Sequence, residues 1–336
     1  MPESNRNLPA KIYSTEQVRQ LELIASEDYG ISSYCLMKRA AHFSYEVLKQ
    51  HWPSANNIAV VCGFGNNAGD GYVLAKLAID DGKQVEVINI CNTENLNGDV
   101  AIAYQDLSTT NVCLQNYSMN IFDGVDVIVD ALFGTGLNRD IKGKFCDLIK
   151  LMNESECPSI SIDIPSGINA NTGQIMNVAV SADVTATFIG LKQGMFTNEG
   201  LAASGKIELS DLDIPEEIYQ QINLNSRTHT VSRLMLHDLN KVLKRRQRNS
   251  HKGHFGHVLV VGGDEGYLGA ARMAAEAAAR VGSGLVSIAT RCSHASSLSA
   301  VRPEVMSHPV ETRDELMQLI ERATVIVIGP GLGKSE

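Results

Sequence analysis

Three polar segments, each directly after an apolar, strand-like run, carry residues that could do chemistry. Residues 63–71 read GFGNNAGDG, residues 130–136 read DALFGTG and residues 163–167 read DIPSG. Glycines at such turns let the backbone approach an anion, and the start of a following helix adds N–H donors and a positive dipole end. The segments therefore predict a ligand site at the ends of strands, with capping of the strand ends as the structural alternative.

The same segments contain oxygen-bearing side chains that suit a hard cation. Asn67, Asp130 and Ser166 each come from a different segment. Amide, carboxylate and hydroxyl oxygens are the ligands that hard cations prefer. Spacing alone does not decide whether these three side chains meet.

The elements around these segments indicate an α/β fold. Apolar runs at 57–62, 84–90, 125–129, 159–162, 183–188 and 206–209 predict strands, and helical spacing at 18–24, 36–48, 73–79 and 145–152 predicts helices. Continuous Val/Ile runs that alternate with helices are typical of a parallel sheet covered on both faces. We expect a three-layer α/β/α, Rossmann-like domain with its ligand crevice at the carboxyl ends of the strands.

A second unit follows a stretch with a weaker pattern. The basic run 244–248 (KRRQR) is interpreted as a solvated linker, after which strands are expected at 257–261, 284–289 and 323–328 with a helix at 270–281. Because a parallel strand needs a following helix to cover it, the last strand indicates an unfinished domain. The expected organisation is a domain over 1–220, a linker over 221–250 and an incomplete domain over 251–336.

Composition excludes several classes of function. The 29 Lys and Arg residues against 38 Asp and Glu residues give a net charge of −9, which argues against a nucleic-acid or anionic-membrane partner. No apolar run is long enough to span a bilayer, and the N-terminus lacks the apolar core of a signal peptide. Seven scattered cysteines without a C-x-x-C pair indicate reduced thiols in a cytoplasmic protein. The oligomeric state stays open, a homo-oligomer included.

Common catalytic motifs fit poorly. Residues 63–68 match a dinucleotide fingerprint, but the carboxylate expected about 20 residues further on has no clear counterpart, which disfavours a simple NAD dehydrogenase. Residues 333–335 (GKS) lack the earlier glycine of a phosphate-binding P-loop. The sequence contains neither H-E-x-x-H nor G-x-S-x-G, so zinc and serine hydrolases are unsupported.

Taken in order, the three segments resemble the N-terminal epimerase domain of the bifunctional NAD(P)H-hydrate repair enzymes. The family's G-x-G-N-N-G-G-D-G carries Ala68 here in place of one glycine, and Lys192 and Gly194 resemble a later K-x-G. The resemblance covers roughly residues 10–220. Residues 252–257 (KGHFGH), 262–263 (GG), 302–306 (RPEVM) and 329–333 (GPGLG) are similar to the start of the family's ribokinase-like dehydratase domain.

The resemblance implies a substrate, NADH or NADPH hydrated at C6 of the nicotinamide ring. The epimerase interconverts the R and S epimers, and the dehydratase consumes the S epimer with ADP or ATP. It also implies a K⁺ ion held by Asn67, Asp130 and Ser166. The substrate-binding residues that it implies are Asn66, Asn67, Ala68, Gly69, Asp70, Gly134, Thr135, Gly136, Leu137, Asn138, Arg139, Asp140 and Asp163, with Ala270 and Gly331 in the second unit.

For the chemistry, Asp163 is the expected catalytic group, since a carboxyl can move the proton at the C6 oxygen while a bond to C6 opens and re-forms. Lys192 either assists it or is a surface or phosphate-neutralising lysine.

Two other functions remain as alternatives. The first is ADP- or ATP-dependent dehydration, and the second is a non-catalytic nucleotide-binding or protein-interaction module. The family's nucleotide site and its catalytic Asp lie in a later G-D-x-L segment that is absent here, so dehydration is not expected from an incomplete second domain.

Overall fold

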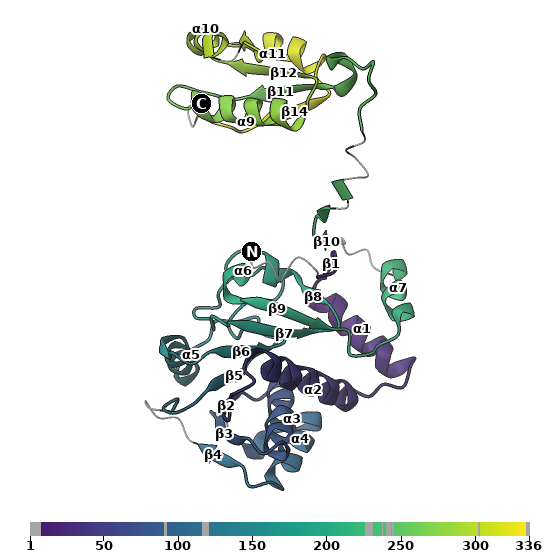
Figure 1. Cartoon of the computed structure of the whole chain (residues 1–336), viewed down its shortest axis with the longest axis vertical. Helices are drawn as coiled ribbons and strands as arrows, with labels where there is room; N and C mark the ends of the chain where they lie inside the picture. The colour runs from purple at the N-terminus through teal and green to yellow at the C-terminus, as the bar shows by residue number, and fades with distance from the viewer. Residues whose placement is uncertain are drawn as a thin grey trace. The chain divides into compact units, whose positions relative to one another are not determined.

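The computed structural model describes residues 8–90, 93–115, 121–225, 231–236, 238–239, 243, 245–301 and 303–333. The chain forms two compact units, residues 1–236 and residues 237–336 (Figure 1). Cys91, Lys244, Arg302 and residues 334–335, which entered the sequence analysis, lie outside the described residues.

The first unit is built on a seven-stranded parallel sheet with strand order β4-β3-β2-β5-β6-β7-β9. Its strands are almost entirely buried, as the continuous apolar runs predict. The strands are β2 (Asn57–Cys62), β3 (Gln84–Asn89), β4 (Cys113–Gln115), β5 (Val127–Ala131), β6 (Ser159–Ile162), β7 (Val184–Phe188) and β9 (Lys206–Ser210).

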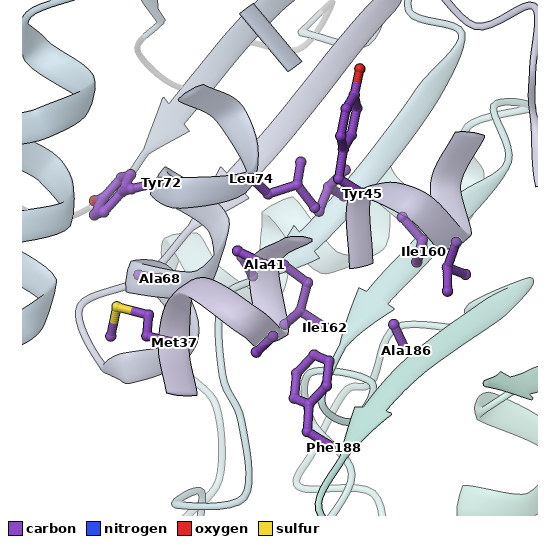
Figure 2. Close-up of a cluster of buried hydrophobic side chains, with 14 of the residues drawn as sticks. Met37, Ala41, Tyr45, Ala68, Tyr72, Leu74, Ile160, Ile162, Ala186 and Phe188 are labelled. Carbon is purple, nitrogen blue, oxygen red and sulfur yellow. The ribbon is translucent and has the colours of Figure 1, made fainter. Parts of the chain in front are cut away.

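Helices cover both faces of this sheet, so the predicted three-layer fold is confirmed. Alternate residues of β2 belong to two different hydrophobic cores, Val60 to one and Val61 to the other. Figure 2 shows part of the first core, where Phe188 and Ile162 from the sheet lie near Ala41. The helices are α1 (Thr15–Glu27), α2 (Ser33–His51), α3 (Asn66–Asp80), α4 (Gly98–Ser108), α5 (Lys144–Glu154), α6 (Gly200–Ala203) and α7 (Glu216–Asn225).

A small second sheet joins the start of the first unit to its later part. Strand β1 (Lys11–Tyr13) pairs with β8 (Leu191–Lys192) in parallel and with β10 (Val231–Ser232) in antiparallel. The Ser14 side chain then caps α1 and forms a capping box with Gln17, as the sequence predicts. These contacts set the position of α1 and of Lys192.

The second unit has four parallel strands in the order β13-β12-β11-β14. Its strands are β11 (His257–Val261), β12 (Leu285–Thr290), β13 (Met306–Pro309) and β14 (Val325–Ile328). Its helices are α9 (Leu268–Val281), α10 (Cys292–Val301) and α11 (Arg313–Ile320). Helix α9 packs Ala271 and Ala275 into a core with Val260 and Ile288.

Two parts of the stretch with a weak sequence pattern make defined structure or contacts. Helix α7 occupies 216–225, within the stretch whose pattern weakens. The Arg246 guanidinium lies 3.9 Å from the centroid of the Phe255 ring and donates a hydrogen bond to the Gly282 carbonyl. Arg246 therefore packs on the second unit, while the described residues of the basic run, Arg245–Arg248, stay exposed as expected.

Two further sequence expectations concern membranes and thiols. None of the described helices is long and apolar enough to cross a membrane. The described cysteines have free thiols, of which Cys62 and Cys146 are buried while Cys113 and Cys292 are exposed.

Candidate active site

The carboxyl ends of four neighbouring strands bring the three polar segments together. Strand β2 lies beside β5, β5 beside β6 and β6 beside β7, with Asp130 paired to Ser161 in the register. The chain order reverses between β2 and β5, because β3 follows β2 on the opposite side. Such a switch point opens a crevice at the strand ends.

A cavity of about 470 Å³ lies at this crevice. Both predicted catalytic residues, Asp163 and Lys192, line it. Ala68 and Gly69 are buried in α3 instead, and Asp140 lines an adjoining cavity of about 450 Å³. The other predicted ligand-binding residues that line the first cavity are Asn66, Asn67, Asp70, Gly134, Thr135, Gly136, Leu137, Asn138 and Arg139.

The first Gly-rich segment runs against the second. A Cβ atom on Gly63 would lie 2.2 Å from the carbonyl oxygen of Leu132, so no larger residue fits there. Ala68, in contrast, is a fully buried residue of the first turn of α3. Its helical backbone needs no glycine, which explains why the departure from the family's pattern is tolerated.

Asp163 adopts a backbone conformation that is rare for its residue type. Its φ is 70°, directly after β6, and its N–H donates a 2.7 Å hydrogen bond to the Ala186 carbonyl. Non-glycine residues in this left-handed region cost free energy and occur often at functional sites. The conformation brings the carboxylate to the cavity, where Oδ2 accepts a hydrogen bond from Thr135 N–H at 3.3 Å.

Lys192 is buried beneath Asp163, with a side chain only 1% exposed. Its Nζ pairs with Asp163 Oδ1 and donates to Thr187 Oγ1 at 2.8 Å and to the Phe188 carbonyl at 3.0 Å. All three ammonium protons thus have an acceptor. The alternative of a surface lysine is wrong.

Two of the three residues predicted to hold a cation, Asp130 and Ser166, are buried and hydrogen-bonded to one another. Asp130 is fully buried and accepts hydrogen bonds from Ser161 Oγ, from Leu132 N–H, and from both the Oγ and the N–H of Ser166. Burial raises the pKa of Asp130, while the hydrogen bonds from Ser166, Ser161 and Leu132 oppose that rise.

Asn67, the third residue predicted to hold a cation, lines the cavity. Its Oδ1 and Nδ2 are buried and have no hydrogen-bond partner among the described residues. A buried, unpaired amide costs free energy unless a ligand satisfies it. The Phe133–Gly134 backbone lies between Ser166 and Asn67. Phe133 N–H donates a hydrogen bond to Ser166 Oγ, and a Cβ atom on Gly134 would lie 3.4 Å from Asn67 Cβ. Asn67 Oδ1 therefore fits a hard cation that prefers oxygen ligands.

Two further carboxyl groups line the cavity near the Asp163–Lys192 pair. Burial raises the pKa of Asp70 well above its usual range, and the charges of Asp163 and Glu22 raise it further, while Lys192 opposes them. Burial also raises the pKa of Glu22, to which the charge of Asp163 adds. Burial and the charge of Asp163 thus raise the pKa of both acids, that of Asp70 the more strongly.

Sequence reasoning missed Glu22 and Arg19, which line the cavity from α1. Both lie on the polar side of an amphipathic helix, where charged residues usually face solvent. The one sequence signal that could have identified them is their spacing: residues three apart lie on the same helix face, and Arg19 and Glu22 each follow a buried residue, Val18 and Leu21. Phe64, half exposed at the second position of the Gly-rich turn, was also missed.

Ala270 and Gly331, predicted to bind substrate, both lie in the second unit. The N–H of Ala270 donates to the Tyr267 carbonyl at 3.1 Å, and a Cβ on Gly331 would lie 2.5 Å from the same oxygen. Ala270 and Gly331 therefore both lie close to the Tyr267 carbonyl, at the start of α9.

Comparison with known proteins assigns the family. The model of the YjeF-related protein N-terminus matches residues 33–194, and that of the NAD(P)H-hydrate dehydratase matches residues 258–336. The chain is 42% identical over 325 residues to the bifunctional NAD(P)H-hydrate repair enzyme Nnr of Coxiella burnetii. It belongs to this family.

Other relatives agree with this membership. The chain is 36% identical over 332 residues to the Nnr enzyme of Escherichia coli strain K12. The alignments include 97% and 98% of this chain but 65% and 63% of the Coxiella and Escherichia proteins, so the chain spans just under two thirds of their length. The crystal structure of yeast ynu0, YNL200c, has the same fold, with a TM-score of 0.56 at 17% identity, over 66% of this chain and 99% of that one.

These matches correct one expectation from the sequence. We expected the second unit to be only the unfinished start of a dehydratase domain. The dehydratase family model matches residues 258–336, and the described part of this segment folds around a core of its own. The expectation of a truncated domain is therefore wrong, and the dehydratase domain is present.

Proposed function

We propose that the first unit epimerises hydrated NADH and NADPH, interconverting the R and S forms at C6 of the nicotinamide ring. The observation that carries this proposal is the Asp163–Lys192 pair at the cavity, in which a strained backbone presents a carboxylate that a buried ammonium orients. Family membership supports the substrate, since the Coxiella and Escherichia relatives are named as NAD(P)H-hydrate repair enzymes.

Inverting C6 requires one group that takes a proton and one that gives a proton. Asp163 takes the proton of the C6 hydroxyl while the bond between C6 and the ring nitrogen breaks. Asp70, whose neutral form the cavity favours, gives its proton to that nitrogen. Rotation of the opened aldehyde and reversal of both transfers close the ring on the other face, and both carboxyls return to their starting states.

The remaining cavity residues bind and orient the substrate. Backbone N–H groups of the Gly134–Asp140 loop and of the first turn of α3 suit the pyrophosphate, because N–H groups and the positive helix end attract anions. Lys192 keeps Asp163 in the orientation that faces the cavity. It is a positioning residue, since its ammonium is already bound by three oxygen acceptors.

The unpaired Asn67 supports a potassium site in the same unit. We propose that Asn67 Oδ1, the Asp130 carboxylate and Ser166 Oγ hold the ion. A bound K⁺ supplies positive charge next to the phosphate-binding turns. It also satisfies the buried Asn67 amide oxygen, which would fix the start of α3.

Direct observation of epimer exchange tests the proposed activity. A purified R epimer of hydrated NADPH is incubated with the intact chain in KCl, and the R/S ratio is followed by chromatography. Approach to equilibrium well above the rate without protein supports the epimerase. An unchanged rate with folded protein would leave only a binding role.

The second unit supports a second activity, because the dehydratase model matches it. We propose that this unit takes part in dehydrating the S epimer with ADP or ATP, with Ala270 and Gly331 at the substrate. Recovery of NADPH absorbance from the S epimer, dependent on added ADP or ATP, would support it. No recovery with either nucleotide would exclude dehydration by this chain.

A further inference from the structure

A second cavity adjoins the candidate active site and is not used by the chemistry proposed above. It encloses about 450 Å³ and shares Phe64, Phe133, Leu137 and Arg139 with the first cavity. Any ligand longer than one nucleotide could therefore extend from one cavity into the other along this shared wall.

Three aromatic rings form one side of the second cavity. Phe64 lies edge-on to Phe133 and Phe145, with ring centroids 6.2 and 6.3 Å apart, and Phe133 lies 5.0 Å from Phe145. Phe64 is 50% exposed, although it belongs to the turn at the crevice. An exposed aromatic cluster beside a nucleotide-binding turn offers a surface on which a purine base can stack.

Charged residues form the rim of the same cavity. Arg139 and Lys142 contribute two cations against one carboxylate, that of Asp140. Neither cationic side chain makes an ion pair or hydrogen bond with another residue in the described part of the chain. They therefore remain available to a phosphate group.

The two cavities differ in charge in a way that orients a dinucleotide. The first contains the carboxyls of Glu22, Asp70 and Asp163 against the cations of Arg19, the shared Arg139 and the buried Lys192, whose ammonium is already paired with Asp163. The part of that cavity beside Asp163 suits the uncharged hydrated ring, while the pyrophosphate lies at the Gly134–Asp140 loop, which borders both cavities. The second cavity, with an excess of cations and an aromatic wall, suits an adenosine that carries phosphate.

We propose that the second cavity binds the adenosine 2′-phosphate half of hydrated NADPH, with adenine on Phe64 and the 2′-phosphate on Lys142. The inference rests on the proposed epimerase function and extends it to substrate choice. The chain then prefers hydrated NADPH to hydrated NADH, because only the former carries a phosphate at that position.

Binding of substrate fragments to the intact chain tests this proposal without any turnover. Adenosine 2′,5′-bisphosphate and AMP are titrated by calorimetry into the wild type, Lys142→Gln, Phe64→Leu and a control, Lys150→Gln, whose exposed lysine lines neither cavity. We expect the bisphosphate to bind about tenfold more tightly than AMP, the scale of one charge-assisted contact.

The variants separate the two contacts. Lys142→Gln should remove the preference for the bisphosphate, and Lys150→Gln should keep it. Phe64→Leu should weaken both ligands about fivefold, because a base loses its stacking surface. Equal affinity for both ligands in the wild type, or affinities that neither variant changes, would overturn the proposal.

Two further measurements are needed. One distinguishes the adenosine of hydrated NADPH from that of a free nucleotide, and the other separates failure of the subsite proposal from failure of the epimerase proposal. If ADP and ATP bind in a manner sensitive to Phe64→Leu and more tightly than the bisphosphate, the cavity serves a free nucleotide and the inference is wrong. In epimerase assays, Lys142→Gln should raise KM for hydrated NADPH alone. If the wild type lacks epimerase activity, the proposed function fails while the affinities still decide the subsite.

Discussion

The ammonium of Lys192 lies against Oδ1 of Asp163, although the two residues come from different strand ends and 28 residues separate them in the chain. Asp163 follows β6 with a positive φ, and Lys192 ends β8, which pairs with β1 rather than with the main sheet. The pair is 18% exposed at the carboxylate and 1% at the lysine. A charged acid thus faces the cavity while its counter-ion is shielded from solvent.

Replacing the carboxyl of Asp163 should abolish most turnover. Asp163→Asn keeps the size of the side chain but cannot take a proton, and we expect kcat to fall about 10²- to 10⁴-fold, the usual contribution of general acid–base catalysis. Asp147→Asn, on the exposed side of α5, is the matched control. Near-normal turnover by a folded Asp163→Asn protein would disprove the role of Asp163.

Removing only the lysine should destabilise the protein. Lys192→Met leaves Asp163 without its cation and removes the hydrogen bonds to Thr187 Oγ1 and the Phe188 carbonyl, so we expect a loss of about 3 kcal/mol in the free energy of unfolding. Urea unfolding measures it. The double variant Asp163→Asn/Lys192→Met should lose less than the sum of the two single changes, because they share one interaction. Strict additivity would mean that the pair contributes nothing.

Potassium should stabilise the first unit through Asn67. We expect the wild-type melting temperature to rise in KCl compared with choline chloride at the same ionic strength, because an ion that binds only the folded state shifts the equilibrium. Asn67→Leu removes the unpaired amide and should abolish the difference between the salts. If the salts act equally on the wild type, or the variant keeps the shift, Asn67 is not a ligand.

The partly buried acid Asp70 predicts a pH-dependent effect on stability. Because burial and neighbouring carboxylates raise its folded-state pKa above the unfolded value, Asp70 contributes stability at low pH that is lost as pH rises through the folded pKa. Asp70→Asn should therefore stabilise the protein at pH 8, by about 1 kcal/mol, and less at pH 4. Thermal melts at both pH values measure this. An equal effect at both, or destabilisation at pH 8, would contradict the raised pKa.

Much of the first unit could be predicted from local sequence. Runs such as Asn57–Cys62 and Ser159–Ile162 are apolar because both faces of their strands are covered, and the structure has strands at those residues. Where such strands end, parallel order brings their carboxyl ends to one edge. Asp130 and Asp163 could therefore be assigned to one site before their distance was known.

Long-range contacts set what local sequence left undetermined. Nothing near Lys192 shows that β8 pairs with β1, which removes this lysine from the surface. The amphipathic pattern of α1 is equally compatible with a Glu22 that faces solvent and with a Glu22 that lines a cavity. Helices α10 and α11 in the second unit are only ten and eight residues long. Such short segments show too little apolar periodicity to be predicted as helices.

The central claim is epimerisation of hydrated NAD(P)H by the first unit, and a coupled assay tests it most directly. A mixture of R and S hydrated NADPH is given to a separate, complete, S-specific dehydratase with its nucleotide, in KCl, and the return of NADPH absorbance is followed. With this chain added, we predict rapid conversion of the whole mixture, and only the S portion followed by a slow tail with its Asp163→Asn variant. An unchanged slow tail with the folded wild-type chain would contradict the account.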